Sequence, residues 1–158
     1  MGHPVLSRTP STEWPSVVEQ FGRGGFSDLF GITIVRSTQG HLQTQLVLRD
    51  ELMLSPGGLL HAGTMLGLAD TSAGWGCVMN LPDHASGFTT IEDKANFIAT
   101  SGTPETLICD AHLLHEGRTT QVWDTEVRRS SDQRVLSLYR CTQALLTAPR
   151  IRRAANTD

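Results

Sequence analysis

Residues 60–78 read LHAGTMLGLADTSAGWGCV, and this stretch decides the fold. Drawn as a helix, it carries small or apolar side chains nearly all round, which is typical of a buried helix rather than a surface one. Its glycines, Gly63, Gly67, Gly74 and Gly76, each cost up to about 1 kcal/mol of helix propensity. We therefore expect a buried helix against which another backbone packs very closely.

Segments rich in β-formers flank this helix. Residues 31–37 and 41–50 alternate in polarity and are joined by a turn at Gln39-Gly40. Four more such segments follow the helix, at 88–98, 105–116, 118–129 and 134–146. Nothing else in the sequence is large enough to bury the helix, so the sheet must cover it. The order predicts an α+β fold, with an antiparallel sheet wrapped around one long buried helix.

The chain has 158 residues, of which 39% are hydrophobic and 18% are charged, as in a single globular domain with its own core. We assign residues 1–12 to a flexible N-terminal segment, 13–148 to the domain and 149–158 to a basic tail. A short helix is expected to begin at Trp14-Pro15, because proline is favoured in the first helical turn.

Charge and hydropathy argue against several classes of partner. A net charge of -3 gives no support to nucleic-acid binding. No apolar run approaches the ~18 residues of a membrane span, and the N-terminus lacks the apolar core of a secretion signal. Three widely spaced cysteines, Cys77, Cys109 and Cys141, are typical of buried, reduced thiols. We expect a cytoplasmic protein that contacts neither membrane nor nucleic acid.

Residues 55–63, SPGGLLHAG, and residues 68–70, LAD, carry the first specific signal. Together they resemble the G-x-x-H-G-G…A-[DE] signature of hotdog-fold acyl-CoA thioesterases, and the phenylacetate-pathway and 4-hydroxybenzoyl-CoA types are the most similar. The resemblance extends over about residues 26–146. It implies a hotdog fold, hydrolysis of an acyl-CoA thioester with no cofactor besides the coenzyme A of the substrate, and a homodimer or homotetramer with shared sites.

Asp70 is the candidate base or nucleophile. A carboxylate on a buried helix is costly unless a neighbour or a reaction uses it, and the resemblance places the family's catalytic carboxylate at this position. The alternative is a structural aspartate that accepts a hydrogen bond from a nearby backbone amide.

The start of the helix is the candidate oxyanion site. Free amides at a helix N-terminus suit the oxyanion formed when a thioester is attacked. The resemblance assigns this donor to the amide of Ala62, which replaces the first glycine of the usual H-G-G. It gives His61 a mainly structural role at the helix start, with direct proton transfer as the alternative. Ser55 stands where many relatives have Asn or Gln to position substrate or water.

Spacing along the helix bears on how Ala62 and Asp70 cooperate. Eight residues separate them, which corresponds to about 12 Å along the axis and roughly 80° around it. One thioester carbon cannot meet both groups of the same chain. A twofold-related pair of helices would bring one chain's Asp70 beside its partner's Ala62, so the spacing predicts a dimer.

Other positions are expected to contact substrate. The resemblance places Gly63 and Gly74 beside it, with Gly74 standing where the 4-hydroxybenzoyl-CoA type has a threonine. Thr90 and Asn96 are candidates for the acyl pocket, or else ordinary polar strand residues. Gly117, Arg118 and Thr119 offer an amide, a guanidinium and a hydroxyl to the coenzyme A phosphates, although a plain hairpin turn explains the glycine equally well.

We predict no metal site. His112 and His115 are three positions apart on an expected strand, so they should point to opposite faces and cannot chelate together. Two rival functions remain: an enoyl-thioester hydratase on the same fold, and a non-catalytic acyl-CoA-binding protein. The expected hydratase motif is absent from the sequence, and the chain leaves no room for the DNA-binding segment that such a binding protein usually carries.

Overall fold

The computed structural model describes residue 18 and residues 22–147. The predicted N-terminal segment and the predicted basic tail lie outside the described residues. So does the helix predicted to begin at Trp14-Pro15, except for residue 18. The long helix α3 spans Ala62–Met79 and is preceded by the short helix α2, Phe26–Phe30, and the single turn η1, Asp50–Leu52. The strands are β1 Thr33–Thr38, β2 His41–Val47, β3 Gly87–Phe97, β4 Thr106–Glu116, β5 Thr120–Arg129 and β6 Val135–Leu146. Within these residues, no helix has both the length and the hydropathy of a transmembrane segment.

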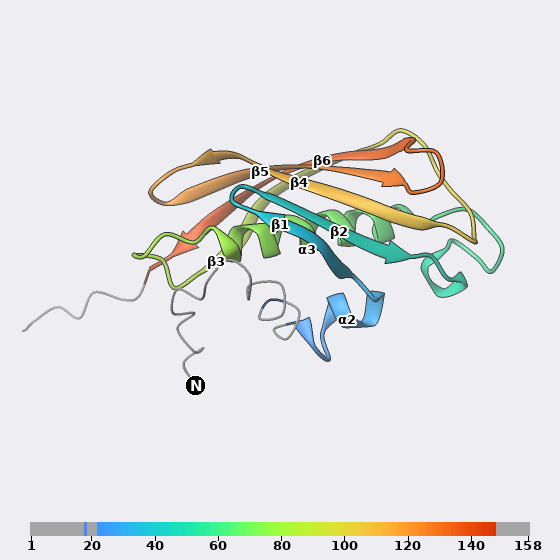
Figure 1. The fold of residues 1–158 in the computed structure, drawn as a ribbon, viewed down its shortest axis with the longest axis horizontal. Coiled ribbons are helices and arrows are strands. Elements are labelled where there is room, and N and C mark those ends of the chain that lie inside the picture. The colour runs from blue at the N-terminus through green and yellow to red at the C-terminus, as the bar shows by residue number, and fades with distance from the viewer. Residues whose placement is uncertain (1–17, 19–21, 148–158) are drawn as a thin grey trace, which may run out of the picture.

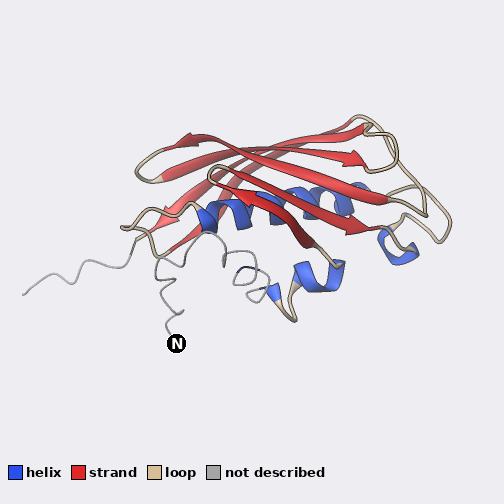
Figure 2. Cartoon of the chain, in the orientation of Figure 1, coloured by secondary structure: helices blue, strands red, loops and turns tan. Residues whose placement is uncertain are grey.

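The predicted architecture is confirmed. All six strands form one antiparallel sheet in the order β1-β2-β4-β5-β6-β3, with α3 lying along one face (Figures 1 and 2). Alternate residues of β2, β4 and β5 are buried against the helix, which is the period-two pattern of a sheet with one covered face. We call the face toward α3 the inner face and the other the outer face. β1 and β3 are the edge strands.

Two irregularities in strand pairing change which residues share a face. In β3 the register shifts between Thr90 and Glu92, and in β4 it shifts between Leu113 and His115. Each shift inserts one extra residue, so the alternation of faces is inverted beyond it. Strict alternation would place Asn96 on the same face as Thr90, and His115 on the face opposite to His112; the two shifts change both placements.

Three glycines of α3 make room for aromatic rings of the same chain. A Cβ atom at Gly76 would lie 2.7 Å from the ring of Trp123, and one at Gly74 would lie 3.1 Å from the ring of Phe88. At Gly67 it would lie 2.6 Å from the ring of Phe26, which belongs to α2. Close packing against these glycines is therefore confirmed within one chain, where aromatic rings supply it.

The sheet buries one side of α3, and the helix is not enclosed all round. Met65, Leu68, Ala69, Ala73 and Cys77 are at most 2% exposed and belong to the core. Leu66, Gly67 and Trp75 are only partly buried, and Ala62 is exposed. All three cysteines are free and buried, in agreement with the prediction of reduced thiols.

Candidate active site

The N-terminus of α3 is held by a small hairpin that precedes it. The carbonyl of Ser55 accepts a 2.8 Å hydrogen bond from the amide of Gly58, and Gly57 has a φ of 68°, a conformation that glycine adopts without strain. Below this turn, Leu54 donates to the carbonyl of Leu59 at 2.9 Å. The exposed Ser55 therefore lies in the turn leading to the helix rather than in the core.

His61 is the N-cap residue of α3. Its Nδ1 accepts a 2.9 Å hydrogen bond from the amide of Gly63, and its carbonyl accepts one from Thr64 at 3.0 Å. Capping in this way satisfies amides that a helix start otherwise leaves unpaired. Among the described residues, no acceptor lies within hydrogen-bonding distance of the amide of Ala62. That amide is exposed at the positive end of the helix dipole, where it can bind an anion.

Asp70 lies in the middle of α3, beneath β6 and β3. Its Oδ1 accepts a hydrogen bond from the Tyr139 hydroxyl at 2.9 Å and another from Thr90 Oγ1 at 3.3 Å. Thr90 Oγ1 also lies 3.0 Å from Gln143 Oε1, so its single proton is shared between two acceptors. Within residues 22–147, Oδ2 of Asp70 has no hydrogen-bond partner. The carboxylate is half-buried, fixed through one oxygen and open through the other.

Tyr139 is a neighbour of Asp70 that was not predicted from the sequence. It is the only tyrosine of the chain and lies on the inner face of β6, where it is 3% exposed. Burial, followed by the negative charges of Cys141 and Asp70 when ionised, raises the pKa of Tyr139 above its ordinary value. The phenol therefore stays protonated and donates to Asp70. The sequence did contain a sign of this role, because Tyr139 places a hydroxyl at a position of β6 that the alternating pattern predicts to be buried.

The bulge in β3 separates the two strand residues expected to line an acyl pocket. Thr90 pairs with Gln143 on the inner face, whereas Asn96 pairs with Leu138 and lies on the outer face beside Lys94. Asn96 therefore does not accompany Thr90 at Asp70 of its own chain. Gly74, one helical turn after Asp70, lies against the ring of Phe88, which is on the inner face of β3.

Residues 117–119 form the turn between β4 and β5. The amide of Gly117 donates a 2.8 Å hydrogen bond to the carbonyl of Thr120. This amide therefore stabilises the turn, the second of the two alternatives considered for it, and is not free to bind phosphate. The side chains of Arg118 and Thr119 are exposed. His84 Nε2 lies 2.7 Å from the carbonyl of Arg118, so an imidazole that was not predicted from the sequence adjoins this turn.

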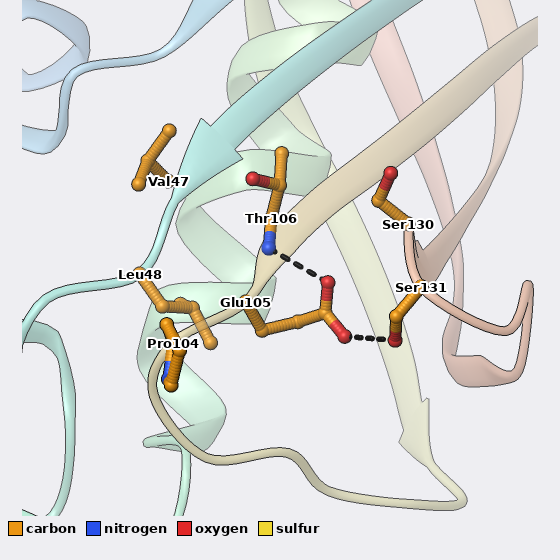
Figure 3. A pocket seen from close by; sticks show the side chains of 7 residues that line it. All are labelled: Val47, Leu48, Pro104, Glu105, Thr106, Ser130 and Ser131. Atoms are coloured by element: carbon orange, nitrogen blue, oxygen red, sulfur yellow. Dashed lines mark hydrogen bonds between the residues drawn. The ribbon is translucent and has the colours of Figure 1, made fainter.

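A cavity of about 350 Å³ lies elsewhere, at the start of β4 and the β5–β6 turn (Figure 3). Its carboxylate is already engaged, because Glu105 accepts hydrogen bonds from the Thr106 amide and the Ser131 hydroxyl. Burial acts to raise the pKa of Glu105, but these hydrogen bonds and the charge of Arg129 hold it below its ordinary value. None of the residues around Asp70 or Ala62 lines this cavity.

Comparison with known proteins identifies the family of the chain. The chain matches the family model of the Thioesterase superfamily over residues 57–136. It is 30% identical over 122 residues to the putative esterase ComA2 of Bacillus subtilis (strain 168), an alignment that covers 75% of this chain and 92% of that one.

Solved structures share the fold. A thioesterase from Haemophilus influenzae superposes with a TM-score of 0.78 at 18% identity, covering 88% of this chain and 94% of that chain. A hypothetical thioesterase protein from Streptococcus pneumoniae, solved with coenzyme A, gives a TM-score of 0.66 at 18% identity, with 73% and 86% covered. The family match spans α3 and strands β3 to β5, and we conclude that this chain is a hotdog-fold member of the thioesterase superfamily.

Proposed function

We propose that the protein hydrolyses an acyl-CoA thioester to the free acid and coenzyme A, with Asp70 as general base or nucleophile. The observation that carries this proposal is the asymmetric environment of the Asp70 carboxylate. Tyr139 and Thr90 hold Oδ1, while Oδ2 has no partner in the described part of the chain. A carboxylate with one oxygen fixed and the other open is suited to accept a proton from water or to attack a carbonyl.

The exposed amide of Ala62 supplies the second function. Attack on the thioester carbonyl carbon moves an electron pair onto the carbonyl oxygen, and an N–H at a helix start stabilises that negative charge. When Asp70 acts as base, water attacks, collapse of the tetrahedral intermediate breaks the carbon–sulfur bond to give the free acid, and the thiolate of coenzyme A takes up the proton removed from water. When Asp70 attacks directly, the same collapse leaves an acyl-aspartyl anhydride, which water then hydrolyses to the free acid. His61 acts as a positioning residue, since its hydrogen bond to Gly63 fixes the first turn in which this amide lies.

The active site is formed by two chains. Ala62 and Asp70 belong to one uninterrupted helix, so they lie about 12 Å apart along its axis. Asp70 is close to β3, an edge strand of 11 residues with Ile91 and Phe97 exposed by 60% and 44%. A long edge strand presents unpaired backbone amides and carbonyls with which a strand of another chain can pair. Pairing of β3 with the same strand of a second copy would cover this edge and bring the partner's helix start toward Asp70.

The nucleotide end of coenzyme A binds near Arg118, Thr119 and His84. This turn lies beside the C-terminal end of α3, because Gln121 of β5 donates to the carbonyl of Asn80 at 2.7 Å. Asp70 is roughly 14 Å from that end of the helix, a separation suited to the extended pantetheine arm. The structure of the Streptococcus pneumoniae neighbour with coenzyme A supports this class of ligand for the fold.

The decisive test is a hydrolysis screen over aromatic, short-chain and long-chain acyl-CoA substrates, following thiol release. At least one class should be turned over, and Asp70→Asn should reduce that turnover by about 10² or more because it removes the charge and basicity of the carboxylate. Crotonyl-CoA serves as a control for hydration of the double bond without thiol release. Near-normal hydrolysis by a folded Asp70→Asn protein would refute the assignment.

A further inference from the structure

A group of metal-ligating side chains lies on the outer face of the sheet, away from Asp70. His41 of β2 pairs directly with His112 of β4, and Asp110 precedes His112 by two positions and so shares its face. One potential ligand atom from each of the three side chains lies within 4.8 Å of the other two. We propose that His41, Asp110 and His112 bind one divalent transition metal ion of the zinc class.

The three side chains lie nearly close enough together to bind one metal ion. Nε2 of His41 is 3.0 Å from Oδ1 of Asp110, and the rings of His41 and His112 stack with centroids 4.4 Å apart. Metal–ligand bonds of 2.0–2.1 Å in tetrahedral geometry place ligand atoms about 3.4 Å apart. The widest separation must therefore shrink by at most roughly 1.4 Å. His112 is exposed, so rotation of its ring can supply this movement.

Neighbouring side chains hold the carboxylate in place. Gln43 donates to Asp110 Oδ1 at 2.9 Å, and Arg128 donates to Oδ2. Such outer contacts orient a ligating carboxylate. Arg128 would repel a cation, but its charge is offset by Glu126, whose Oε1 lies 3.5 Å from the Arg128 guanidinium. Binding requires neutral histidines, and the metal takes the place of the proton between His41 and Asp110.

The donor set selects the kind of metal. Two imidazoles and one carboxylate favour Zn²⁺, Co²⁺, Ni²⁺ or Cu²⁺, whereas Mg²⁺ and Ca²⁺ prefer oxygen ligands alone. Three protein ligands leave one tetrahedral position for water or a small anion. A groove of about 470 Å³ that begins at His112 and runs past Asp124 to Arg140 gives access to that position.

Our prediction of no metal site considered only His112 and His115. The bulge in β4 places both on the outer face, where His112 pairs with Asp124 and His115 with Val122. The argument that they point to opposite faces was therefore wrong, yet they do not form the group together. His41, which is distant in sequence and adjacent through the β2–β4 pairing, completes it instead.

The test is metal binding by the full chain, purified without a histidine tag and stripped with EDTA. Titration with Zn²⁺ by calorimetry should give one site per chain, and Co²⁺ should produce the visible absorption of a four-coordinate ion with nitrogen and oxygen ligands. His41→Ala and His112→Ala should each weaken binding by at least tenfold. His115→Ala and His3→Ala remove a histidine outside the group and should leave the stoichiometry and the Co²⁺ spectrum unchanged.

Thermal melting adds a readout that does not depend on catalysis. Zn²⁺ should raise the Tm of the wild type, because a ligand that binds the folded state stabilises it, and this rise should vanish in the His41→Ala/His112→Ala double variant. Circular dichroism in EDTA establishes that the variants are folded. Equal metal binding by the wild type and the folded double variant, or no binding at millimolar Zn²⁺, would overturn the proposal.

Discussion

Tyr139 and Asp70 are 69 positions apart in the sequence and are joined by a 2.9 Å hydrogen bond. The bond connects the inner face of β6 to the middle of α3, and the other carboxylate oxygen of Asp70 has no hydrogen-bond partner within residues 22–147. In the mechanism we propose, Tyr139 is a positioning residue that orients the carboxylate without touching the substrate. This relationship leads to the first prediction.

Tyr139→Phe should lower kcat by about tenfold or more while KM changes little, because a hydrogen bond to a charged group contributes about 1.5–3 kcal/mol. The variant keeps the ring and therefore the packing around it. Thr90→Val is the matched comparison and should have a smaller effect, since its bond to Asp70 is longer, at 3.3 Å. An unchanged kcat in folded Tyr139→Phe would leave this phenol with a purely structural role.

Mixed subunits test whether the site is shared. Asp70→Asn and Ala62→Leu proteins should each be inactive at every concentration, the second because its side chain crowds the oxyanion amide. Mixed dimers contain one site with both defects and one site with neither, so mixing followed by subunit exchange should restore part of the activity. No recovery from dimers shown by mass spectrometry to be mixed would return both groups to a single chain.

Arg118→Ala should raise KM for acyl-CoA more than it lowers kcat, because a remote phosphate contact contributes mainly uniform binding. Acyl-pantetheine, which lacks the nucleotide, is the control substrate. Its steady-state kcat and KM should be nearly the same for Arg118→Ala and the wild type. If both substrates lose activity equally, the side chain of Arg118 supports the β4–β5 turn and does not bind phosphate.

Two glycines of α3 should respond differently to alanine. Gly76→Ala places a methyl group 2.7 Å from Trp123, which is fully buried and cannot move away. We expect a loss of about 1–3 kcal/mol of unfolding free energy, more than the helix-propensity gain of roughly 1 kcal/mol. Gly67→Ala meets the tip of Phe26, which is 52% exposed and can rotate, so its effect should be much smaller.

Urea unfolding curves of the two variants at one temperature measure this difference, provided that the m-values agree with that of the wild type. The interpretation fails if Gly67→Ala destabilises the protein as much as Gly76→Ala does.

The three thiols should be unreactive in the native protein. Burial raises the pKa of Cys77 and of Cys109 to about 12 and that of Cys141 to about 11. Since the thiolate is the nucleophile, these groups should react with a disulfide reagent at neutral pH only as fast as the protein opens. The measurement compares the rates at which the cysteines react with the reagent in the presence and in the absence of denaturant. Rapid labelling of one cysteine in the folded protein would contradict its burial.

The sequence predicted the helix and all six strands because each carries a clear period. The expected helix at 60–78 is observed at 62–79, and the four segments expected after it coincide with β3 to β6 to within about two residues at each end. The five-residue helix α2 was not expected, since so short a segment shows no helical period. Its existence depends on tertiary contact, with Phe26 and Phe30 stacked on each other at 4.1 Å and Phe26 against Gly67.

The arrangement of the site was less accessible from the sequence. Bulges at Ile91 and Leu114 carry no residue-type signal, yet they decide the faces of Asn96 and His115. The partnership of Tyr139 with Asp70 depends on how β6 lies over α3, which local pattern does not encode. The helix start was easier to interpret, because its amides are arranged by the backbone of contiguous residues.

The bulge in β3 also places a constraint on the gene that point substitutions do not reveal. Deletion of Ile91 would remove the extra residue and leave every other side chain of the strand on its present face. Deletion of Thr89, by contrast, would force either Phe88 away from Gly74 or Thr90 away from Asp70, because the two would become neighbours in the strand. We therefore expect an in-frame deletion to persist at Ile91 and to be purged at Thr89, so that the place of a length change matters more than its size.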